Sequence, residues 1–363
     1  MKSSTVSSSE AVRAGLEVVL VVSVDTEEDN WAPTRVGVSV ENVRELKRLS
    51  RCFDRIGVRA TYFTSYQVAA RPWAVDVLRE IADGGRAEIG AHLHPWNTPP
   101  TDEPLVPRNT MMKNLPPELQ RAKLERLTSQ LTAVFGAAPI AFRAGRFGLG
   151  AEAVPALLAC GYQLDSSVTP FVNWEATDDG PNFVGAPLDA YRVGTGQDIR
   201  VPAPDGPLVE IPITCGYTRF ASGRWPALHR VLHTRPARAL HLAGLASRSG
   251  FAKLTVLSPE LESVTDMLAL SRGALEGGVR HLHLFFHSVT LRPGLSPWTS
   301  SAEDVERMYA AIDNYLEGLF RTACVRFATV SEAGLALGLG SPSLQPSNQA
   351  VTRPWRATPA GCS

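Results

Sequence analysis

Short apolar runs of strand type alternate with longer runs of helical periodicity along the chain. Residues 16–25, LEVVLVVSVD, are almost continuously apolar, which is typical of a strand buried on both faces of a parallel sheet. Residues 40–57 place apolar side chains at helical spacing and end in a glycine. Further strands are expected within residues 58–65, 87–94, 139–147, 162–168, 208–214, 281–288 and 325–330. Further helices are expected within residues 73–85, 116–136, 151–160, 259–277 and 302–320.

Repeated strand and helix units predict an α/β fold around a parallel sheet, either open or closed into a (β/α) barrel. A single domain is expected over residues 16–335, because single α/β barrels reach this length. Residues 1–15 are rich in serine, and residues 336–363 are rich in serine, proline and glycine, so both segments are expected to be disordered.

Composition restricts the partners and the compartment. Lysine and arginine number 36, as do aspartate and glutamate, so no global charge attracts nucleic acid. Five cysteines without CxxC spacing argue against a disulfide framework and indicate a reducing compartment. The sequence contains no secretory h-region and no run of about 18 apolar residues, and we therefore expect a cytoplasmic protein.

Polar side chains gather where the predicted strands end. The carboxyl ends of parallel strands meet at one edge of a sheet or barrel, and function collects there. The residues expected at this edge are Asp25, Glu27, Glu28, Asp29, His92, His94, Arg143, Arg146, Asp165 and His287. Four acids in five residues would repel one another unless a cation or an arginine lay among them.

His92 and His94 stand two residues apart at a predicted strand end, so both side chains face one side. Two histidines and one carboxylate, with coordination positions left open, form a recurring site for catalytic zinc and related divalent metals such as cobalt, nickel or manganese. A remaining carboxylate could then act as the general base on a metal-bound water.

Two further residues have the chemistry of a hydrolytic site. Arg143 keeps its charge, so it could hold a catalytic carboxylate in its ionised form. In HLHLFFHS three histidines share one strand face, but only His287 lies at the carboxyl end, where it suits a general acid. His281 and His283 lie nearer the opposite end and are expected to be structural.

Five motifs, in order, make the chain resemble the polysaccharide deacetylases, also called the NodB-homology family: SVDTEED, EIGAHLH, FRAGRFG, LDSSV and LFFHS. The spacing DxE and HxH resembles a divergent subgroup. The resemblance implies a distorted (β/α) barrel over about residues 16–335 and a metal-dependent deacetylase.

The resemblance also implies a role for each matching residue. Glu27, His92 and His94 would bind the metal, with Glu28 or Asp29 as alternatives to Glu27. Asp25, paired with Arg143, would be the base. His287, oriented by Asp165, would protonate the leaving group.

Two features of the sequence concern the substrate and partners. Trp31, Trp96 and Trp298 fall in loops at the functional edge, and with Arg146 they are candidate sugar-binding residues. Residues 211–259 contain no acid but seven basic residues, and within them residues 216–258 read as an insertion of two basic amphipathic helices. This insertion could contact an anionic membrane, bind phosphate, or simply cover the barrel.

Three functions therefore remain open. The first is removal of acetyl groups from a sugar or glycan precursor, for which lipid-linked and nucleotide-linked forms both fit. The second is hydrolysis of other C–N bonds, such as those of cyclic amides. The third is a carbohydrate-binding relative without activity, which the joint presence of Asp25, Arg143, Asp165 and His287 argues against.

Overall fold

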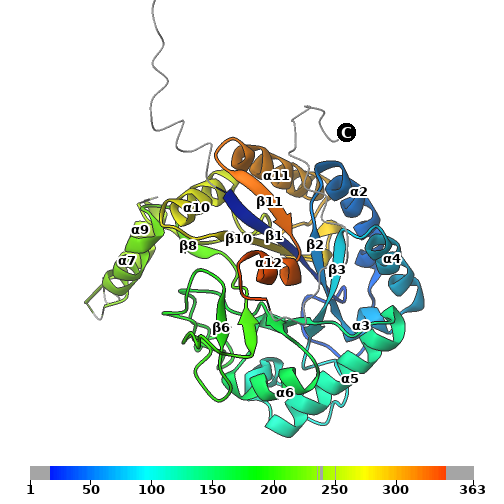
Figure 1. Cartoon of the computed structure of the whole chain (residues 1–363). Helices are drawn as coiled ribbons and strands as arrows, with labels where there is room; N and C mark the ends of the chain where they lie inside the picture. Colours follow the sequence, from blue (N-terminus) through cyan, green and yellow to red (C-terminus); the bar gives the residue numbers. More distant parts are fainter. Residues whose placement is uncertain (1–16, 235, 238–239, 250, 341–363) are drawn as a thin grey trace, which may run out of the picture.

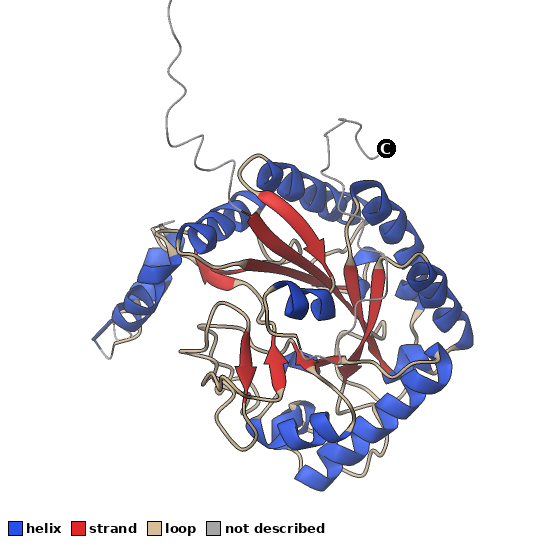
Figure 2. Cartoon of the chain, viewed as in Figure 1, coloured by secondary structure: helices blue, strands red, loops and turns tan. Residues whose placement is uncertain are grey.

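A parallel sheet curls around the centre of the molecule, and helices cover its outer side (Figures 1 and 2). The computed structural model describes residues 17–340 except 235, 238, 239 and 250. The two predicted disordered segments therefore lie largely outside the described residues, and their disorder remains a prediction. The predicted α/β fold of distorted (β/α) barrel type is confirmed.

The main sheet has nine strands, of which eight follow one path. In order they are β10 (His281–His287), β1 (Glu17–Thr26), β2 (Ala60–Ser65), β3 (Ala87–Leu93), β4 (Ala141–Ala144), β5 (Leu164–Asp165), β7 (Leu208–Glu210) and β6 (Tyr191–Val193). All neighbours on this path are parallel except the last pair, β6 and β7. The register places Asp25 beside His287, and His92 beside Arg143.

The ninth strand distorts the barrel. Strand β11 (Cys324–Ala328) pairs with the first half of β1, whereas β2 pairs with the second half of the same strand. One edge of β1 thus serves two neighbours in turn, and the sheet splays at the amino-terminal ends of its strands. Helix α12 (Val330–Ala336) lies near the centre of the curled sheet (Figure 1). Its Val330 and Ala333 pack with Val21, Ala141 and Leu164 of the strands.

The outer helices bury apolar faces against the sheet. They are α2 (Leu46–Ile56), α3 (Tyr66–Ala69), α4 (Pro72–Asp83), α5 (Pro117–Phe135), α6 (Val154–Ala159), α10 (Val264–Glu276) and α11 (Ala302–Phe320). Helix α11 begins at a capping box in which Ser301 and Asp304 satisfy each other's backbone N–H groups, a motif typical of a well-defined helix start. Two large apolar clusters fill the space between these helices and the strands.

A two-stranded antiparallel ribbon, β8 (Cys215–Tyr217) and β9 (Leu254–Val256), lies beside β10. Hydrogen bonds join the segments at its base to β10, since the Phe285 N–H donates to the Leu257 carbonyl and the His283 N–H donates to the Thr214 side-chain hydroxyl. The ribbon carries the predicted insertion, with helices α7 (Trp225–Leu232) and α9 (Leu242–Arg248).

Several sequence expectations need correction. Strands β6, β8 and β9 were not expected, because each has only three residues and too little periodicity of its own. Strand β7 is equally short, but it lies within the longer apolar run of residues 208–214. The first predicted helix begins as a 3-10 turn, Glu41–Glu45, before α2. The described chain also stays packed beyond residue 335, since Leu337 is buried and Arg192 donates to the Leu339 carbonyl.

The structure bears on two expectations about the environment of the protein, the state of its cysteines and the lack of a membrane span. Cys52, Cys160, Cys215 and Cys324 form no disulfide, and Cys362 lies outside the described residues. Among the helices that the structure describes, none combines the length and the hydrophobicity needed to cross a membrane. The expected compartment remains a prediction.

Candidate metal and catalytic site

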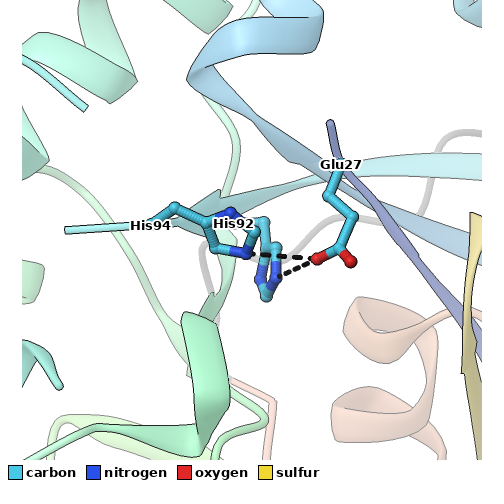
Figure 3. Close-up of side chains that lie close together, drawn as sticks. All are labelled: Glu27, His92 and His94. Carbon is cyan, nitrogen blue, oxygen red and sulfur yellow. Dashed lines mark ion pairs between the residues drawn. The ribbon is translucent and has the colours of Figure 1, made fainter. Parts of the chain in front are cut away.

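Three side chains converge at the carboxyl ends of β1 and β3 (Figure 3). His92 is the second-last residue of β3, His94 directly follows that strand, and Glu27 directly follows β1. The Glu27 Oε2 lies 3.1 Å from the His94 Nε2 and 3.6 Å from the His92 Nε2. Their ligand atoms lie within 4.8 Å of one another, and all three residues are buried. Figure 3 shows both imidazole edges directed at the carboxylate.

The far nitrogen of each imidazole has an acceptor that fixes the ring. The His92 Nδ1 donates to the Arg143 carbonyl at 3.1 Å, and the His94 Nδ1 donates to the Glu28 carboxylate at 2.7 Å. The Nε2 of each ring is thus the atom that faces Glu27 and the atom that a cation would bind. Metal-binding histidines in proteins are oriented in this way by carbonyl and carboxylate partners.

The donor set fits a divalent cation. Burial alone would raise the pKa of Glu27, but the charge of His287 and hydrogen bonds from His92 and His94 hold it well below its usual range. The carboxylate is therefore ionised. Burial lowers the pKa of His94, but Glu28 and Glu27 outweigh it and raise the value to about 10. A cation would take the place of the imidazole proton, so binding would release protons.

The alternatives for the carboxylate ligand have other tasks. Glu28 accepts from His94, from the Trp96 indole at 3.2 Å and from Asn97 at 2.5 Å. Asp29 accepts from the backbone N–H groups of Glu41 and Asn42, at the start of the following 3-10 turn. The geometry therefore groups Glu27, and neither Glu28 nor Asp29, with the two histidines.

Asp25 and Arg143 form a fully buried ion pair next to this cluster. The Arg143 Nη1 lies 2.5 Å from the Asp25 Oδ1, and the other Asp25 oxygen lies 4.0 Å from the His92 Nε2. Arg143 is clamped in place, because its Nε and Nη2 donate to the carbonyl and hydroxyl of Ser166. The sequence expectation that these two residues pair agrees with this geometry.

His287 faces Asp25 from the neighbouring strand, with 3.9 Å between the Nε2 and the Oδ2. Its Nδ1 donates to the Glu260 Oε1 at 2.6 Å, and its backbone N–H donates to the other oxygen of the same carboxylate at 3.1 Å. Burial lowers the pKa of His287, but Glu260, Glu27 and Asp25 together raise it to about 10. The imidazole is thus protonated at neutral pH, and a cation nearby would lower this pKa.

The expectation that Asp165 orients His287 is wrong, because Glu260 occupies that position. Asp165 accepts instead from the hydroxyl and N–H of Ser167. It lies beside Glu210, whose pKa is raised well above its usual range by burial and by the Asp165 charge. Burial also raises the pKa of Asp165, so the protonated form is favoured at this pair of carboxyl groups. The sequence offered one signal for Glu260: it is the first acid after the acid-free residues 211–259.

The four candidate sugar-binding residues divide into two groups. Trp31 is 45 % exposed, and its ring meets those of His287 and Trp298 edge to face at 5.4 and 4.7 Å. The Trp298 ring stacks on His287 at 6.0 Å. Trp96 is buried and stacks on His94 at 4.1 Å, so its indole is no platform for a sugar and that expectation is wrong.

Arg146 was expected to bind the sugar, but its guanidinium contacts other residues of the protein. Its guanidinium pairs with Asp178 at 2.7 Å and donates to the Thr110 hydroxyl. The glycine before it matters more: a Cβ at Gly145 would lie 2.5 Å from the His94 ring and 2.8 Å from the Leu93 carbonyl. Gly145 therefore lets β4 approach the second histidine closely.

A surface hollow of about 290 Å³ lies beside the catalytic candidates. It shares Glu260 and Trp298 with the surroundings of His287. Its remaining lining residues are Pro259, Thr299, Asp304, Arg307, Met308 and Ala311.

Comparisons with known proteins concern the whole fold. No protein-family model and no curated protein matches the sequence. A crystal structure from Parabacteroides distasonis, described as a "putative glycoside hydrolase/deacetylase", aligns with a TM-score of 0.53 and 12% identity over 90% of this chain and 71% of the other. The chain has the fold of the polysaccharide deacetylases. The Parabacteroides match supports this assignment of the fold alone, since its identity is low.

Two more structures align over most of their length, with lower scores. A "putative polysaccharide deacetylase" from Mycobacterium smegmatis aligns at 19% identity over 94% of each chain, with a TM-score of 0.49. A chitin deacetylase from the fungus Colletotrichum lindemuthianum aligns at 13% identity over 91% of this chain and 95% of the other, with a TM-score of 0.40. Within the deacetylase fold, the cluster around Glu27 occupies the carboxyl ends of the strands.

Proposed function

We propose that this chain is a metal-dependent hydrolase that removes acetyl groups from an acetylated sugar or glycan. One observation carries the proposal: Glu27, His92 and His94 converge within 4.8 Å directly beside the buried Asp25 and Arg143 pair. A divalent-cation site next to a carboxylate that can act as general base, at the carboxyl end of the barrel, is the arrangement that metal-dependent hydrolysis requires. The deacetylase fold supports the substrate class.

Glu27, His92 and His94 would hold the cation, and one carboxylate with two imidazoles favours zinc, while cobalt, nickel and manganese are compatible. When bound, the cation would polarise the acetyl carbonyl and lower the pKa of a neighbouring water. Protein groups would perform the proton transfers. Asp25, held in its ion pair with Arg143, would take the proton from the attacking water.

His287 would return a proton to the leaving nitrogen or oxygen of the sugar. Despite burial, the carboxylates of Glu260, Glu27 and Asp25 raise the pKa of His287 and so favour the protonated form, and the two contacts with Glu260 hold its Nε2 toward Asp25. Water adds to the acetyl carbon, the bond to the sugar breaks, and acetate and the free amine or hydroxyl are the products. Base and acid stand on paired residues of adjacent strands, so both can reach one bond.

Trp31 and Trp298 would provide the walls for the sugar ring. Both touch the ring of His287, and Trp31 is largely exposed. Sugar faces commonly pack on exposed aromatic rings. The hollow lined by Trp298 and Arg307 would receive a neighbouring part of the substrate.

Metal analysis followed by an acetate-release screen tests the proposal. The purified protein should contain about one equivalent of a divalent metal, and His92→Ala and His94→Ala should each lose it while remaining folded. Asp25→Asn should keep the metal and lose roughly two to four orders of magnitude in turnover. Acetylated sugars, with their lipid and nucleotide conjugates, are the substrates to screen.

The same screen separates the alternatives. Turnover of cyclic amides without acetate release would favour hydrolysis of other C–N bonds. Sugar binding without turnover, in a parent protein that contains no metal, would indicate a binding relative. A full equivalent of metal in both histidine variants would place the metal elsewhere and contradict the proposed site.

A further inference from the structure

The insertion carried by the β8 and β9 ribbon has an unusual surface. Helices α7 and α9 stand beyond the outer ring of helices, at the left of Figure 1. Twelve large apolar side chains are exposed in the described chain, and six of them fall within residues 220–251. These six are Phe220, Val231, Leu240, Leu242, Leu245 and Phe251. Half of the exposed large apolar side chains of the described chain therefore lie in this short segment.

Each helix of the insertion has a buried face and an exposed face. In α7 the residues Trp225, His229 and Leu232 are buried, at a spacing that marks one face toward the protein. Arg230 and Val231 are exposed on the other face. In α9, Leu242 and Leu245 are one turn apart, and both are exposed, at 38 % and 57 %. The apolar positions therefore form an outer surface and are not simply the back of a buried helix.

The charge of this surface has one sign. Arg219, Arg224, Arg230 and Arg248 are exposed, and residues 211–259 contain no acid. Within the described chain none of these four arginines forms an ion pair, whereas most other arginines do, as Arg48 does with Glu306. Lys253 differs, because it pairs with Glu262 and Asp266. Arg235 and Arg238 belong to the same stretch but lie outside the described residues.

We infer that this surface, which we call the basic apolar face, docks on an anionic lipid membrane. The face comprises Phe220, Arg224, Arg230, Val231, Leu245, Arg248 and Phe251. Interfacial amphipathic segments combine apolar side chains that enter the headgroup boundary with cations that attract acidic lipids. A protein partner would usually present cations as well as acids, and this face contains no acid with which such cations could pair. The inference goes beyond the proposed function and does not depend on it.

Buried side chains attach the insertion to the rest of the protein. Trp225 packs into the apolar core beside α10, where a Cβ at Gly273 would lie 2.8 Å from its ring. The helices are therefore anchored from within while their outer side remains exposed.

Vesicle co-sedimentation of the full-length protein tests the inference. The probes are vesicles of phosphatidylcholine alone and of phosphatidylcholine with phosphatidylglycerol. Binding is expected only to the anionic vesicles, and it should weaken between 50 mM and 500 mM salt because screening shortens the field. Replacing Arg224, Arg230 and Arg248 by Gln should lower the partition coefficient roughly 100-fold at low salt, since each cation near such a surface contributes about fivefold.

Two matched variants make the result specific. Replacing Arg51, Arg121 and Arg321 by Gln removes the same charge from other exposed positions and should leave binding nearly unchanged. Replacing Val231, Leu245 and Phe251 by Ser should weaken binding at every salt concentration, because it removes the apolar contribution. Far-UV circular dichroism confirms that each variant is folded.

Three outcomes would overturn the inference. One is no binding of the parent protein to anionic vesicles at 50 mM salt. Another is equal loss of binding in both arginine triple variants, which would indicate a general charge effect. The third is a dimer in analytical ultracentrifugation that the Val231, Leu245 and Phe251 variant converts to a monomer, because a second copy would then cover the face.

Discussion

The Glu260 carboxylate holds His287 at two points, through the ring Nδ1 at 2.6 Å and the backbone N–H at 3.1 Å. Glu260 lies just beyond the end of the β9 segment, whereas His287 ends β10. The carboxylate therefore fixes both the direction of the imidazole and its charge. It also connects the catalytic candidate to the chain segment that carries the insertion.

Glu260→Gln should lower turnover about 10- to 100-fold and change its pH dependence. The proposed acid must be protonated, so the rate falls as pH rises through the pKa of His287. Removing the negative charge lowers that pKa, and the fall should occur at lower pH. A pH–rate profile measures this shift. Asp165→Asn is the control, and a shift of this limb in Asp165→Asn but not in Glu260→Gln would restore Asp165 as the orienting residue.

Glu27→Gln and Glu28→Gln should differ in metal binding. Glu27 supplies a ligand atom, so its variant should lose the metal on dialysis. Glu28 holds the far side of the His94 ring through the Nδ1 and supplies no ligand atom, and such outer partners contribute about 10- to 100-fold in affinity. Competition with a chelator measures both. Stronger metal loss in Glu28→Gln than in Glu27→Gln would reverse the two roles.

Gly145→Ala should damage the site by crowding. The new methyl group would meet the His94 ring at 2.5 Å and a backbone carbonyl at 2.8 Å, so the ring or the strand must shift. Overpacking of this kind costs about 1–3 kcal/mol of stability, and metal affinity should fall with it. Urea unfolding and chelator competition test this. Gly223→Ala is the matched control, since nothing lies within 4 Å of its added Cβ, and equal effects in both would exclude crowding as the cause.

Asp189→Asn should reduce the free energy of unfolding at neutral pH but not in strong acid. Burial would raise the pKa of Asp189, but hydrogen bonds from His281 and Arg280 lower it to about 2. A lowered carboxyl pKa stabilises the fold above the unfolded value near 4, and this contribution is lost as pH falls through 2. We expect about 1 kcal/mol, because the site is partly exposed. Urea unfolding at pH 7 and pH 2 measures it, and a difference that persists at pH 2 would contradict the assignment.

Sequence patterning was sufficient for the long elements and for the edge of the sheet that carries the site. The apolar run before Asp25 and the alternation before His92 and His287 each predict a strand with its polar residues at the carboxyl end. Because parallel strands share that edge, the rule brings residues far apart in sequence to one place. Three short strands were not predicted: β6, β8 and β9 have three residues each, too few to show a period.

The sequence by itself determined which side chains could meet, since strand direction and the alternation of side chains are local properties. Only the tertiary structure decided which of them pair. Glu28 and Glu27 are neighbours in the chain, yet one orients His94 and the other faces both imidazoles. Trp96 is buried against His94, whereas Trp31 is exposed beside His287. Glu260 reaches His287 because the insertion ends alongside β10. These choices depend on how distant segments pack in space, and sequence spacing carries no record of that packing.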